Sequence, residues 1–410
     1  MSGDLRSVEA QLATVLARVR SVDSERLPVA QAAGRILRGR VLAGVDIPVF
    51  DNSAMDGFAV RFDDVAHGLP VPLTVVADVP AGSAADPALR PGEAARIMTG
   101  AVLPSAADTV VPFEHTAGGL ADSLERISVE QAPSRRGAHV RLRGEDLRAG
   151  DPVVDDGAEL TALAIAAIAA SGVPEVAVAR RPRVAVIATG AELVPPGVTL
   201  DRGQIPESNS VLLAALATAA GAEVVLVRTV GDDGAEVVAA VAEAERLGAD
   251  ACVCSGGVSA GAYEPVRTGL AASMSFTKVA MQPGKPQGFG ASEAGTLLFG
   301  LPGNPVSAAV SFEVFVRPAL RAMQGARELA RPPLRLPAAS SWRSAVGRRQ
   351  YLPAVIDRSD PAAWRVRPAT AGGSGSHLAG GLAHAEAYAI VPAEAERVSE
   401  GDLLDVMVVV

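Results

Sequence analysis

The clearest pattern of hydrophobic and polar positions lies between residues 182 and 330, where short continuous apolar runs alternate with stretches of helical periodicity. Residues 184–188 and 251–254 are typical of buried strands, and residues 208–220 and 235–247 of helices. This alternation predicts a doubly wound α/β domain built on a parallel sheet. Ligands of such sheets bind in the crevice outside the carboxyl ends of the strands, so we expect the functional site there.

The rest of the chain has a different pattern of apolar and polar residues. Apolar positions recur with helical period from Val8 to Val19, which predicts an amphipathic first helix. A second, Ala-rich helix is predicted at residues 160–171, and we expect it to pack against the first. Short β-branched runs separated by Pro and Gly follow Val45, and strand-like alternation follows Arg331. The expected domains are a helical linker domain (1–45 plus 144–181), a small β domain inserted into it (46–143), the α/β domain (182–330) and a C-terminal β-barrel-like domain (331–410).

Composition and charge narrow the function classes. The 410 residues carry a net charge of −9 without a long basic run, which argues against a nucleic-acid partner. The longest apolar run, residues 160–170, is too short to span a bilayer, and the first residues lack a signal pattern. Cys252 and Cys254 point to one face of a strand and cannot bridge, so we expect packed core thiols and a cytoplasmic protein. The five histidines show no metal-ligand or triad spacing.

Two lysines stand out among the basic residues. Lys278 and Lys285 are the only lysines of 37 basic side chains, and they lie seven residues apart. An ammonium is a compact point charge, whereas a guanidinium is a planar fork that cannot fill the same pocket. Lys285 lies in a Pro-Gly-Lys-Pro turn whose restricted backbone can hold one side chain in place. We interpret Lys285 as a residue that contacts an anion. The alternative is that the two lysines have been retained by chance in a chain whose other basic residues are arginines.

Gly-rich and acidic segments follow the predicted strands. Residues 255–259 and 300–307 have the composition of a phosphate cradle, and in the second segment Asn304 suits a helix N-cap. Acidic residues recur at the same edge, at Glu192, Asp232 and Glu264. Carboxylates would repel a phosphate unless a hard cation bridged them, and magnesium suits that role. The alternative for each acid taken singly is a solvated loop residue.

Several motifs occur together in the order in which one protein family has them: residues 51–59, 96–100, 188–193, 255–259, 283–286 and 300–307. Over essentially its whole length the chain resembles the molybdopterin molybdenumtransferases, a family that includes bacterial MoeA, plant molybdenum insertase and the E domain of gephyrin. The resemblance implies an enzyme that inserts molybdate into adenylated molybdopterin, releases AMP and requires Mg²⁺. It also implies a homodimer in which the β domain of the partner subunit completes each cleft, and an interaction with the adenylyltransferase that supplies the substrate.

The resemblance also assigns roles to individual positions. Catalytic roles fall to Asp56, Thr99, Glu192, Asp232, Glu264, Lys278 and Lys285, with magnesium on Glu192, Asp232 and Glu264. Substrate contacts fall to Ser208, Asn209, Ser255, Gly256, Gly257, Ser259, Gln282, Pro283, Asn304, Ser307, Arg348 and Ser376. The chain departs from the family pattern at Glu264 (usually Asp), Gln282 (Lys in many members) and Glu386 (usually Asn).

Two other functions remain open on sequence grounds. A non-catalytic scaffold is one, since gephyrin uses this module to cluster receptors, and a nucleotide pyrophosphatase that shares the α/β domain is the other. Arg348, Ser376 and the segment 51–57 favour the transferase over both, and a pure scaffold has no use for them.

Overall fold

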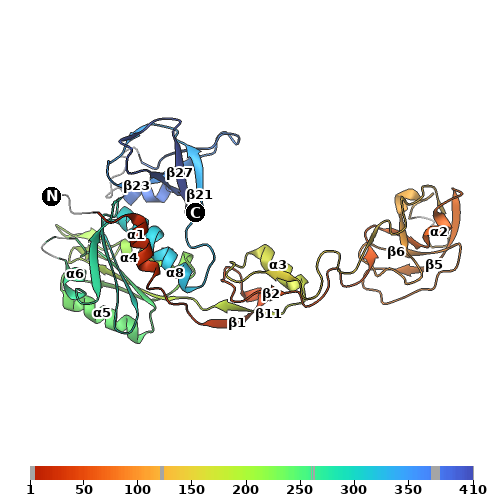
Figure 1. Ribbon diagram of the computed structural model, residues 1–410, viewed down its shortest axis with the longest axis horizontal. Helices are drawn as coiled ribbons and strands as arrows, with labels where there is room; N and C mark the ends of the chain where they lie inside the picture. The colour runs from red at the N-terminus through yellow and green to blue at the C-terminus, as the bar shows by residue number, and fades with distance from the viewer. Residues whose placement is uncertain (1–4, 121–123, 260, 262–263, 371–378, 410) are drawn as a thin grey trace.

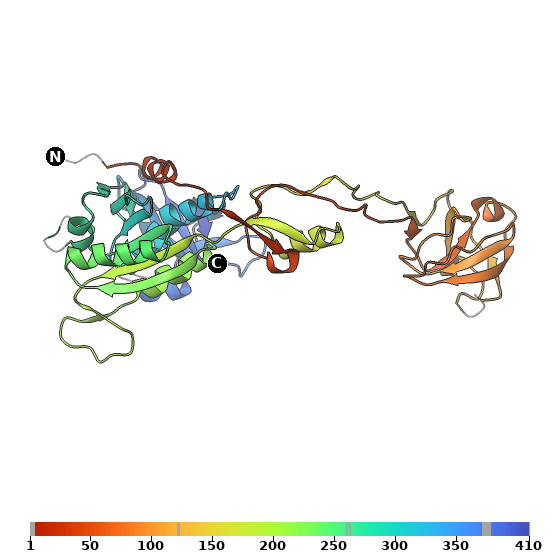
Figure 2. The same ribbon diagram turned by 90° about the horizontal axis from the view of Figure 1, so that it is seen from below.

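The chain has an elongated shape in the computed structural model, which describes residues 5–120, 124–259, 261, 264–370 and 379–409. A body formed by the α/β and C-terminal domains lies at one end and the small β domain at the other, joined by a narrow linker (Figures 1 and 2). The linker carries the chain out to the β domain and back. In the described part of the chain, no helix is long and apolar enough to cross a membrane.

A six-stranded sheet forms the centre of the α/β domain. Its strands are, in order across the sheet, β15 (Glu223–Val230), β12 (Arg183–Thr189), β16 (Ala251–Ser255), β20 (Leu297–Leu301), β19 (Pro286–Ala291) and β17 (Met274–Lys278). The predicted parallel pairing is confirmed from β15 to β20. β19 and β17 add an antiparallel edge that the apolar pattern did not predict. The Pro and Gly residues of β19 hide this strand from a search for continuous apolar runs.

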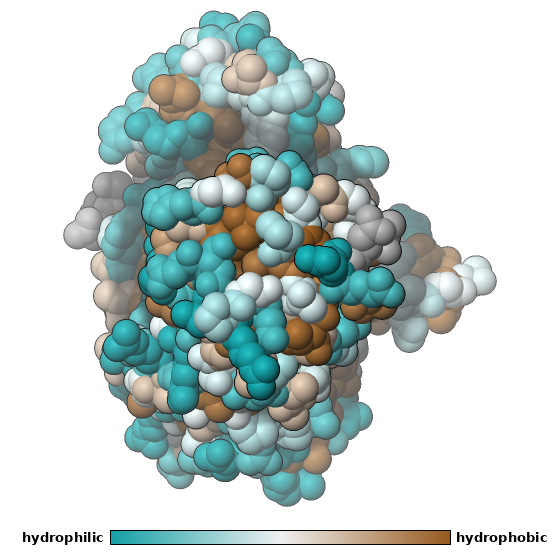
Figure 3. Space-filling view, turned by 90° about the vertical axis from the view of Figure 1, so that its right-hand side faces the viewer, coloured by the Kyte–Doolittle hydropathy of each residue, from teal (hydrophilic) through white to brown (hydrophobic). Residues whose placement is uncertain are grey.

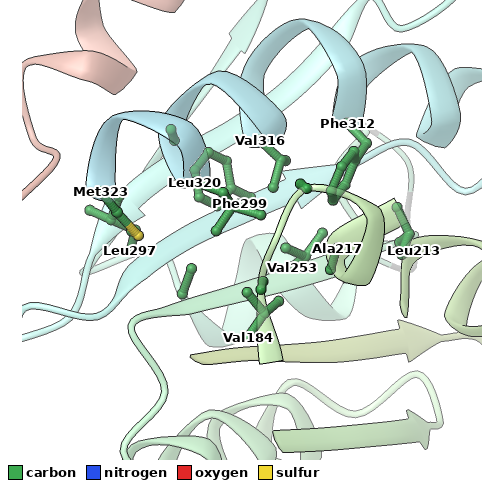
Figure 4. Close-up of a cluster of buried hydrophobic side chains, with 14 of the residues drawn as sticks. Val184, Leu213, Ala217, Val253, Leu297, Phe299, Phe312, Val316, Leu320 and Met323 are labelled. Atoms are coloured by element: carbon green, nitrogen blue, oxygen red, sulfur yellow. The ribbon is translucent and has the colours of Figure 1, made fainter. Parts of the chain in front are cut away.

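Helices cover both faces of this sheet. One face carries α4 (Asn209–Ala219), α7 (Pro305–Ser311), the π-helical turn η3 (Phe312–Val316) and α8 (Arg317–Met323), and the other carries α5 (Gly234–Arg246) and α6 (Pro265–Gly269). Figure 4 shows the first of these interfaces, in which Leu213, Phe312 and Leu320 from the helices pack over Val184 and Phe299 from the strands. Full burial of each such side chain is worth about 1.5–3 kcal/mol.

Both cysteines lie on the opposite face of the sheet. Cys252 and Cys254 are fully buried, unbridged and packed with Ile187 and the apolar side of α5. Burial raises the pKa of the Cys254 thiol to about 12. The thiols are therefore neutral packing groups, as the sequence predicted.

The first helix belongs to the body of the molecule. In α1 (Val8–Leu16), Ser7 caps the N-terminus by accepting a hydrogen bond from the Ala10 amide, and the helix packs against η3 and α8. The Ala-rich helix α3 (Ala162–Ala170) instead packs in the linker, so the expected contact between the two helices is wrong. Periodicity shows that α1 buries one face, but it does not show which element covers that face.

The linker consists mainly of paired strands, although the sequence predicted a helical linker domain. β1 (Ser24–Pro28) pairs with β11 (Glu175–Ala179), and β2 (Val41–Leu42) pairs with β10 (Pro152–Val154). The short η1 (Val29–Gln31) and α3 close this small core. Leu163 of α3 is 84% exposed, which shows how little of this helix is covered.

The small β domain is a five-stranded sheet with the order β7-β4-β6-β5-β8. Its elements are β3 (Asn52–Ser53), β4 (Gly57–Val60), α2 (Phe62–Val65), β5 (Val71–Val79), β6 (Glu93–Ile97), β7 (Thr109–Pro112), η2 (Phe113–His115), β8 (Arg126–Val129) and β9 (Val140–Arg141). The sheet buries an apolar core on each face. Seen end-on, the outer face of this domain mixes hydrophilic with hydrophobic residues (Figure 3).

The C-terminal domain is built on a second six-stranded sheet. Its strands are β18 (Met281–Gln282), β23 (Arg349–Asp357), β25 (Ala387–Val391), β27 (Leu403–Val408) and β21 (Pro333–Pro337), with β24 (Arg365–Pro368) beside β23, and β22 (Trp342–Arg343) pairs separately with β26 (Arg397–Val398). The remaining described turn is η4 (Ala379–His384). β18 comes from the α/β domain and pairs in parallel with β23, so one sheet joins the two domains.

Candidate active site

A cleft of about 940 Å³ lies at the carboxyl edge of the parallel strands, between the α/β domain and the C-terminal domain. This is the position that the strand-end rule predicted. Most of the predicted site residues line it: Glu192, Ser208, Asn209, Asp232, Gly256, Gly257, Ser259, Glu264, Gln282, Pro283, Lys285, Asn304, Ser307 and Arg348.

The other predicted residues lie elsewhere. Ser255 ends β16 and is buried, with a hydroxyl that has no partner in the described part of the chain. Lys278 ends β17, opposite Pro286 in the strand pairing, and its exposed side chain does not line the cleft. Ser376 lies outside the described residues.

Asp56 and Thr99 are brought together in the β domain. This domain lies at the opposite end of the molecule from the α/β domain, whose strand ends line the cleft (Figure 1). Asp56 Oδ1 accepts hydrogen bonds from the Thr99 amide and the Thr99 hydroxyl, both at 2.7 Å. The backbone hydrogen bond from Thr99 lowers the pKa of Asp56 below its ordinary value. The next residue, Gly57, has no room for a side chain, because a Cβ there would lie 2.1 Å from the Val111 carbonyl oxygen of the paired strand.

Glycine backbone forms the floor of the cleft. Gly256 and Gly257 follow β16 with φ of +87° and +63°, a region that favours glycine. A Cβ on Gly256 would also lie 2.7 Å from the Thr189 carbonyl oxygen. Gly303 approaches from the next loop, where a Cβ would lie 3.4 Å from the Gly256 Cα. A ligand can therefore approach peptide groups closely along this edge.

The start of α4 forms one wall of the cleft. Asn209 Nδ2 donates to the Gly303 carbonyl oxygen at 2.7 Å, which ties α4 to the loop before α7. Glu207 also lines the cleft, although sequence reasoning missed it. Its buried carboxylate accepts hydrogen bonds from the amide and the hydroxyl of Ser210. The sequence signal that could have identified Glu207 is its position three residues before Ser210, at the start of a predicted helix.

The loop before α7 matches its prediction. Asn304 is the N-cap residue and Pro305 the first residue of the helix. Asn304 and Ser307 both line the cleft, so the helix start faces the ligand space.

Two cations face the cleft from different domains. Lys285 comes from the α/β domain and Arg348 from the loop before β23, and neither side chain has a hydrogen-bond or ion-pair partner in the described part of the chain. The turn before Lys285 is held firmly, since Gln287 Nε2 donates to the Gly284 carbonyl oxygen and to Ser311 Oγ, both at 2.7 Å. The cleft thus holds two cations that form no ion pair with a described carboxylate.

The three predicted magnesium carboxylates do not form a ligand cluster. No group of three or more His, Cys, Asp or Glu among the described residues is arranged to hold a metal ion. The Glu264 carboxylate folds back and accepts hydrogen bonds from the Ser259 amide at 2.7 Å and the Gly261 amide at 3.0 Å. Glu192 and Asp232 line the cleft with carboxylates that bond to no other described residue.

Glu386, one of the departures from the family pattern, lies outside the cleft. Its carboxylate accepts a hydrogen bond from the Ile356 amide at 2.7 Å and pairs with Arg358 at 2.6 Å. Glu386 therefore holds the start of β25 against the end of β23 within the C-terminal domain.

The fold and the cleft define a multidomain α/β protein whose cleft at the strand ends is shared with a C-terminal domain. The chain matches models of the MoeA N-terminal region (domain I and II) over residues 6–172, a probable molybdopterin binding domain over residues 185–322 and the MoeA C-terminal region (domain IV) over residues 335–409. It is 41% identical over 413 residues to molybdopterin molybdenumtransferase 2 of Mycobacterium tuberculosis, covering 98% of this chain and 99% of the relative. The chain belongs to the molybdopterin molybdenumtransferase family.

Two further similarities agree with this assignment. Molybdopterin molybdenumtransferase 1 of Mycobacterium tuberculosis is 37% identical over 426 residues, with 98% of each chain covered. The crystal structure of the molybdopterin biosynthesis MoeA protein from Pyrococcus horikoshii matches with a TM-score of 0.83 at 26% identity, covering 99% of this chain and 100% of that chain.

Proposed function

We propose that this chain inserts molybdate into adenylated molybdopterin, with release of AMP and formation of molybdenum cofactor. The observation that carries the proposal is the pair of unpartnered cations, Lys285 and Arg348, that face a glycine-floored cleft from two domains. The names of the relatives support the choice of substrates.

The proposed chemistry needs positioning more than covalent catalysis. Molybdate and the phosphate and dithiolate groups of the pterin are all anionic, so they repel each other. Lys285 and Arg348 offset that repulsion, while the amides near Gly256 and Gly303 hold the ligand in place. No described His or Cys lines the cleft, which fits a mechanism without a covalent protein intermediate.

Magnesium is the proposed cofactor, with Glu192 and Asp232 as its protein ligands. Both carboxylates line the cleft without other partners among the described residues, and Mg²⁺ is commonly held by one or two carboxylates plus phosphate oxygens. The ion would neutralise phosphate charge at this edge. Glu264 shapes the loop by accepting the Ser259 and Gly261 amides.

A homodimer would complete the site. Asp56 and Thr99 form an exposed pair on a β domain that extends away from its own cleft (Figures 1 and 2). Their carboxylate and hydroxyl can act on a ligand only if they reach the cleft of another copy. We further propose direct transfer of substrate from the molybdopterin adenylyltransferase, and a cytoplasmic location in keeping with the unbridged Cys252 and Cys254.

One experiment tests the function against its alternatives. The purified chain is mixed with adenylated molybdopterin, molybdate and magnesium, and AMP is measured over time. We expect AMP release that depends on molybdate. Equal release without molybdate would indicate a nucleotide pyrophosphatase, and bound substrate without any release would indicate a scaffold.

A further inference from the structure

A half-buried glutamine, Gln282, and a fully buried one, Gln350, lie side by side at the seam between the α/β and C-terminal domains. Gln282 of β18 and Gln350 of β23 are direct partners in the parallel strand pairing. Gln282 lies three residues before Lys285, and Gln350 two residues after Arg348, so the pair connects the segments that carry both cations of the cleft. Met281 and Tyr351, which neighbour the two glutamines along β18 and β23, point to the opposite face and belong to the apolar core of the seam.

The hydrogen-bonding groups of this pair are complementary but unpaired. Gln350 is fully buried, and its Oε1 accepts a hydrogen bond from Trp342 Nε1 at 3.2 Å. An indole N–H can only donate, so this contact fixes the amide orientation and leaves Gln350 Nε2 as a buried donor. Gln350 Nε2 and Gln282 Oε1 are both buried without a partner in the described part of the chain. An unpaired buried donor next to an unpaired buried acceptor is costly, and one hydrogen bond would satisfy both.

The other end of the Gln282 amide remains available to a ligand. Gln282 lines the cleft, and its Nε2 is neither bonded to a described residue nor among the enclosed polar atoms. A neutral amide N–H adds a directional donor beside the point charge of Lys285 and the fork of Arg348.

We propose that Trp342, Gln350 and Gln282 form a hydrogen-bond relay that aims the Gln282 amide N–H at a tetrahedral oxyanion in the cleft. Trp342 donates to Gln350, Gln350 donates to Gln282 Oε1 when the anion binds, and Gln282 Nε2 donates to the anion. Each bond polarises the next, which strengthens the last one. Gln282 is then a specificity residue, with Gln350 and Trp342 as positioning residues. Identifying the oxyanion as molybdate rests on the proposed function.

The test measures sodium molybdate binding by titration calorimetry at fixed ionic strength, alongside molybdate-dependent AMP release. Gln282→Met and Gln350→Met each remove one amide with little change in side-chain length. We expect each single variant to bind molybdate about tenfold more weakly, as for loss of a hydrogen bond to a charged group. The double variant should bind no more weakly than either single variant, because both changes break the same relay. The KM for molybdate should rise in parallel, while kcat and the KM for adenylated molybdopterin change less than about twofold.

Tryptophan variants supply the matched control. Trp342→Phe keeps the ring but removes the N–H donor, and we expect about threefold weaker molybdate binding. Trp364→Phe makes the same exchange at an exposed ring of the same domain that contacts Arg358, and we expect no change. If Gln350→Met does not fold, Gln282→Met and Trp342→Phe carry the test.

The outcomes separate the relay from the function. A parent that binds molybdate with this pattern of losses but releases no AMP would retain the relay and overturn the proposed function. An active parent whose Gln350→Met variant binds molybdate equally well would overturn the relay. A Gln350→Met variant that only melts at a lower temperature would assign Gln350 a structural role and overturn the relay as well.

Discussion

Replacement of Lys285 tests the central electrostatic argument. The turn that carries Lys285 is fixed, because Gly284 has a φ of +99° and its carbonyl oxygen accepts a hydrogen bond from Gln287. A Cβ at Gly284 would lie 2.9 Å from Ser311 Oγ, so the turn has little room to shift. A longer, planar Arg side chain therefore starts from the same backbone position and cannot retreat to accommodate its extra length.

The magnitude follows from the contact that is lost. Two unit charges about 4 Å apart attract by about 4 kcal/mol at an effective dielectric constant near 20. Desolvation of the exposed Lys285 ammonium offsets part of this attraction, and hydrogen bonds to charged groups contribute a net of about 1.5–3 kcal/mol. Lys285→Ala should thus raise the KM for molybdate roughly 10- to 150-fold. Lys285→Arg should fall within about threefold of Lys285→Ala, because the fork does not reproduce the point charge.

The assay follows AMP release across molybdate concentrations at constant ionic strength and saturating adenylated molybdopterin. Arg26→Lys, an exposed exchange in the linker that retains the charge, is the control and should match the parent. Circular dichroism and melting temperature establish that each variant folds. If Lys285→Arg keeps a molybdate KM within about twofold of the parent, the interpretation of Lys285 as a shape-selective point charge is wrong.

Three further predictions test the shared site, the metal and the Asp56 contact. Mixed Asp56→Ala and Arg348→Ala chains should regain part of the AMP release that each lacks alone, because a heterodimer holds one intact cleft, and no recovery at any ratio would exclude a shared site. The Asp232→Asn variant should require more magnesium for its half-maximal rate of AMP release, at an unchanged melting temperature. If it releases AMP as fast as the parent at limiting magnesium, Asp232 is a solvated residue and not a magnesium ligand. The lowered pKa of Asp56 means that its contact with Thr99 stabilises the fold above the ordinary Asp pKa and is lost as pH falls through the lowered value. Thr99→Ala should therefore raise the Asp56 titration midpoint in NMR spectra, and an unmoved midpoint would contradict the hydrogen-bond assignment.

The fold was predictable where apolar patterning carries the information. Strands such as β12 and β16 are buried on both faces, and this leaves continuous apolar runs in the sequence. The antiparallel β19 was missed because its glycines allow close strand approach, as at Gly290, where a Cβ would lie 1.9 Å from the Ser273 carbonyl oxygen. The partner of α1 was missed because periodicity identifies a buried face without identifying what covers it.

The candidate site was predictable where backbone geometry restricts the residue type. Gly256 and Gly257 could be predicted because their backbone conformation and close contacts favour glycine. Lys285 could be predicted because it is one of only two lysines in the chain and lies in a Pro-Gly-Lys-Pro turn. The bonds that Glu264 makes to its own loop leave no signal in composition or spacing. The separation of Asp56 from its own cleft was implied by the family resemblance, and local sequence alone does not predict it because it depends on the path of the whole linker.

The two-residue strand β18 has a consequence for where the chain can be divided. It lies within the α/β domain in sequence, yet it forms one edge of the C-terminal sheet through its pairing with β23. A fragment that starts near Arg331 would lack this strand and expose unpaired peptide groups along β23, together with the apolar side of Tyr351. The sequence boundary between these domains is therefore a poor site for truncation or domain exchange. A fragment or chimera that retains the C-terminal sheet must also carry residues 281–282, and with them the turn that leads to Lys285.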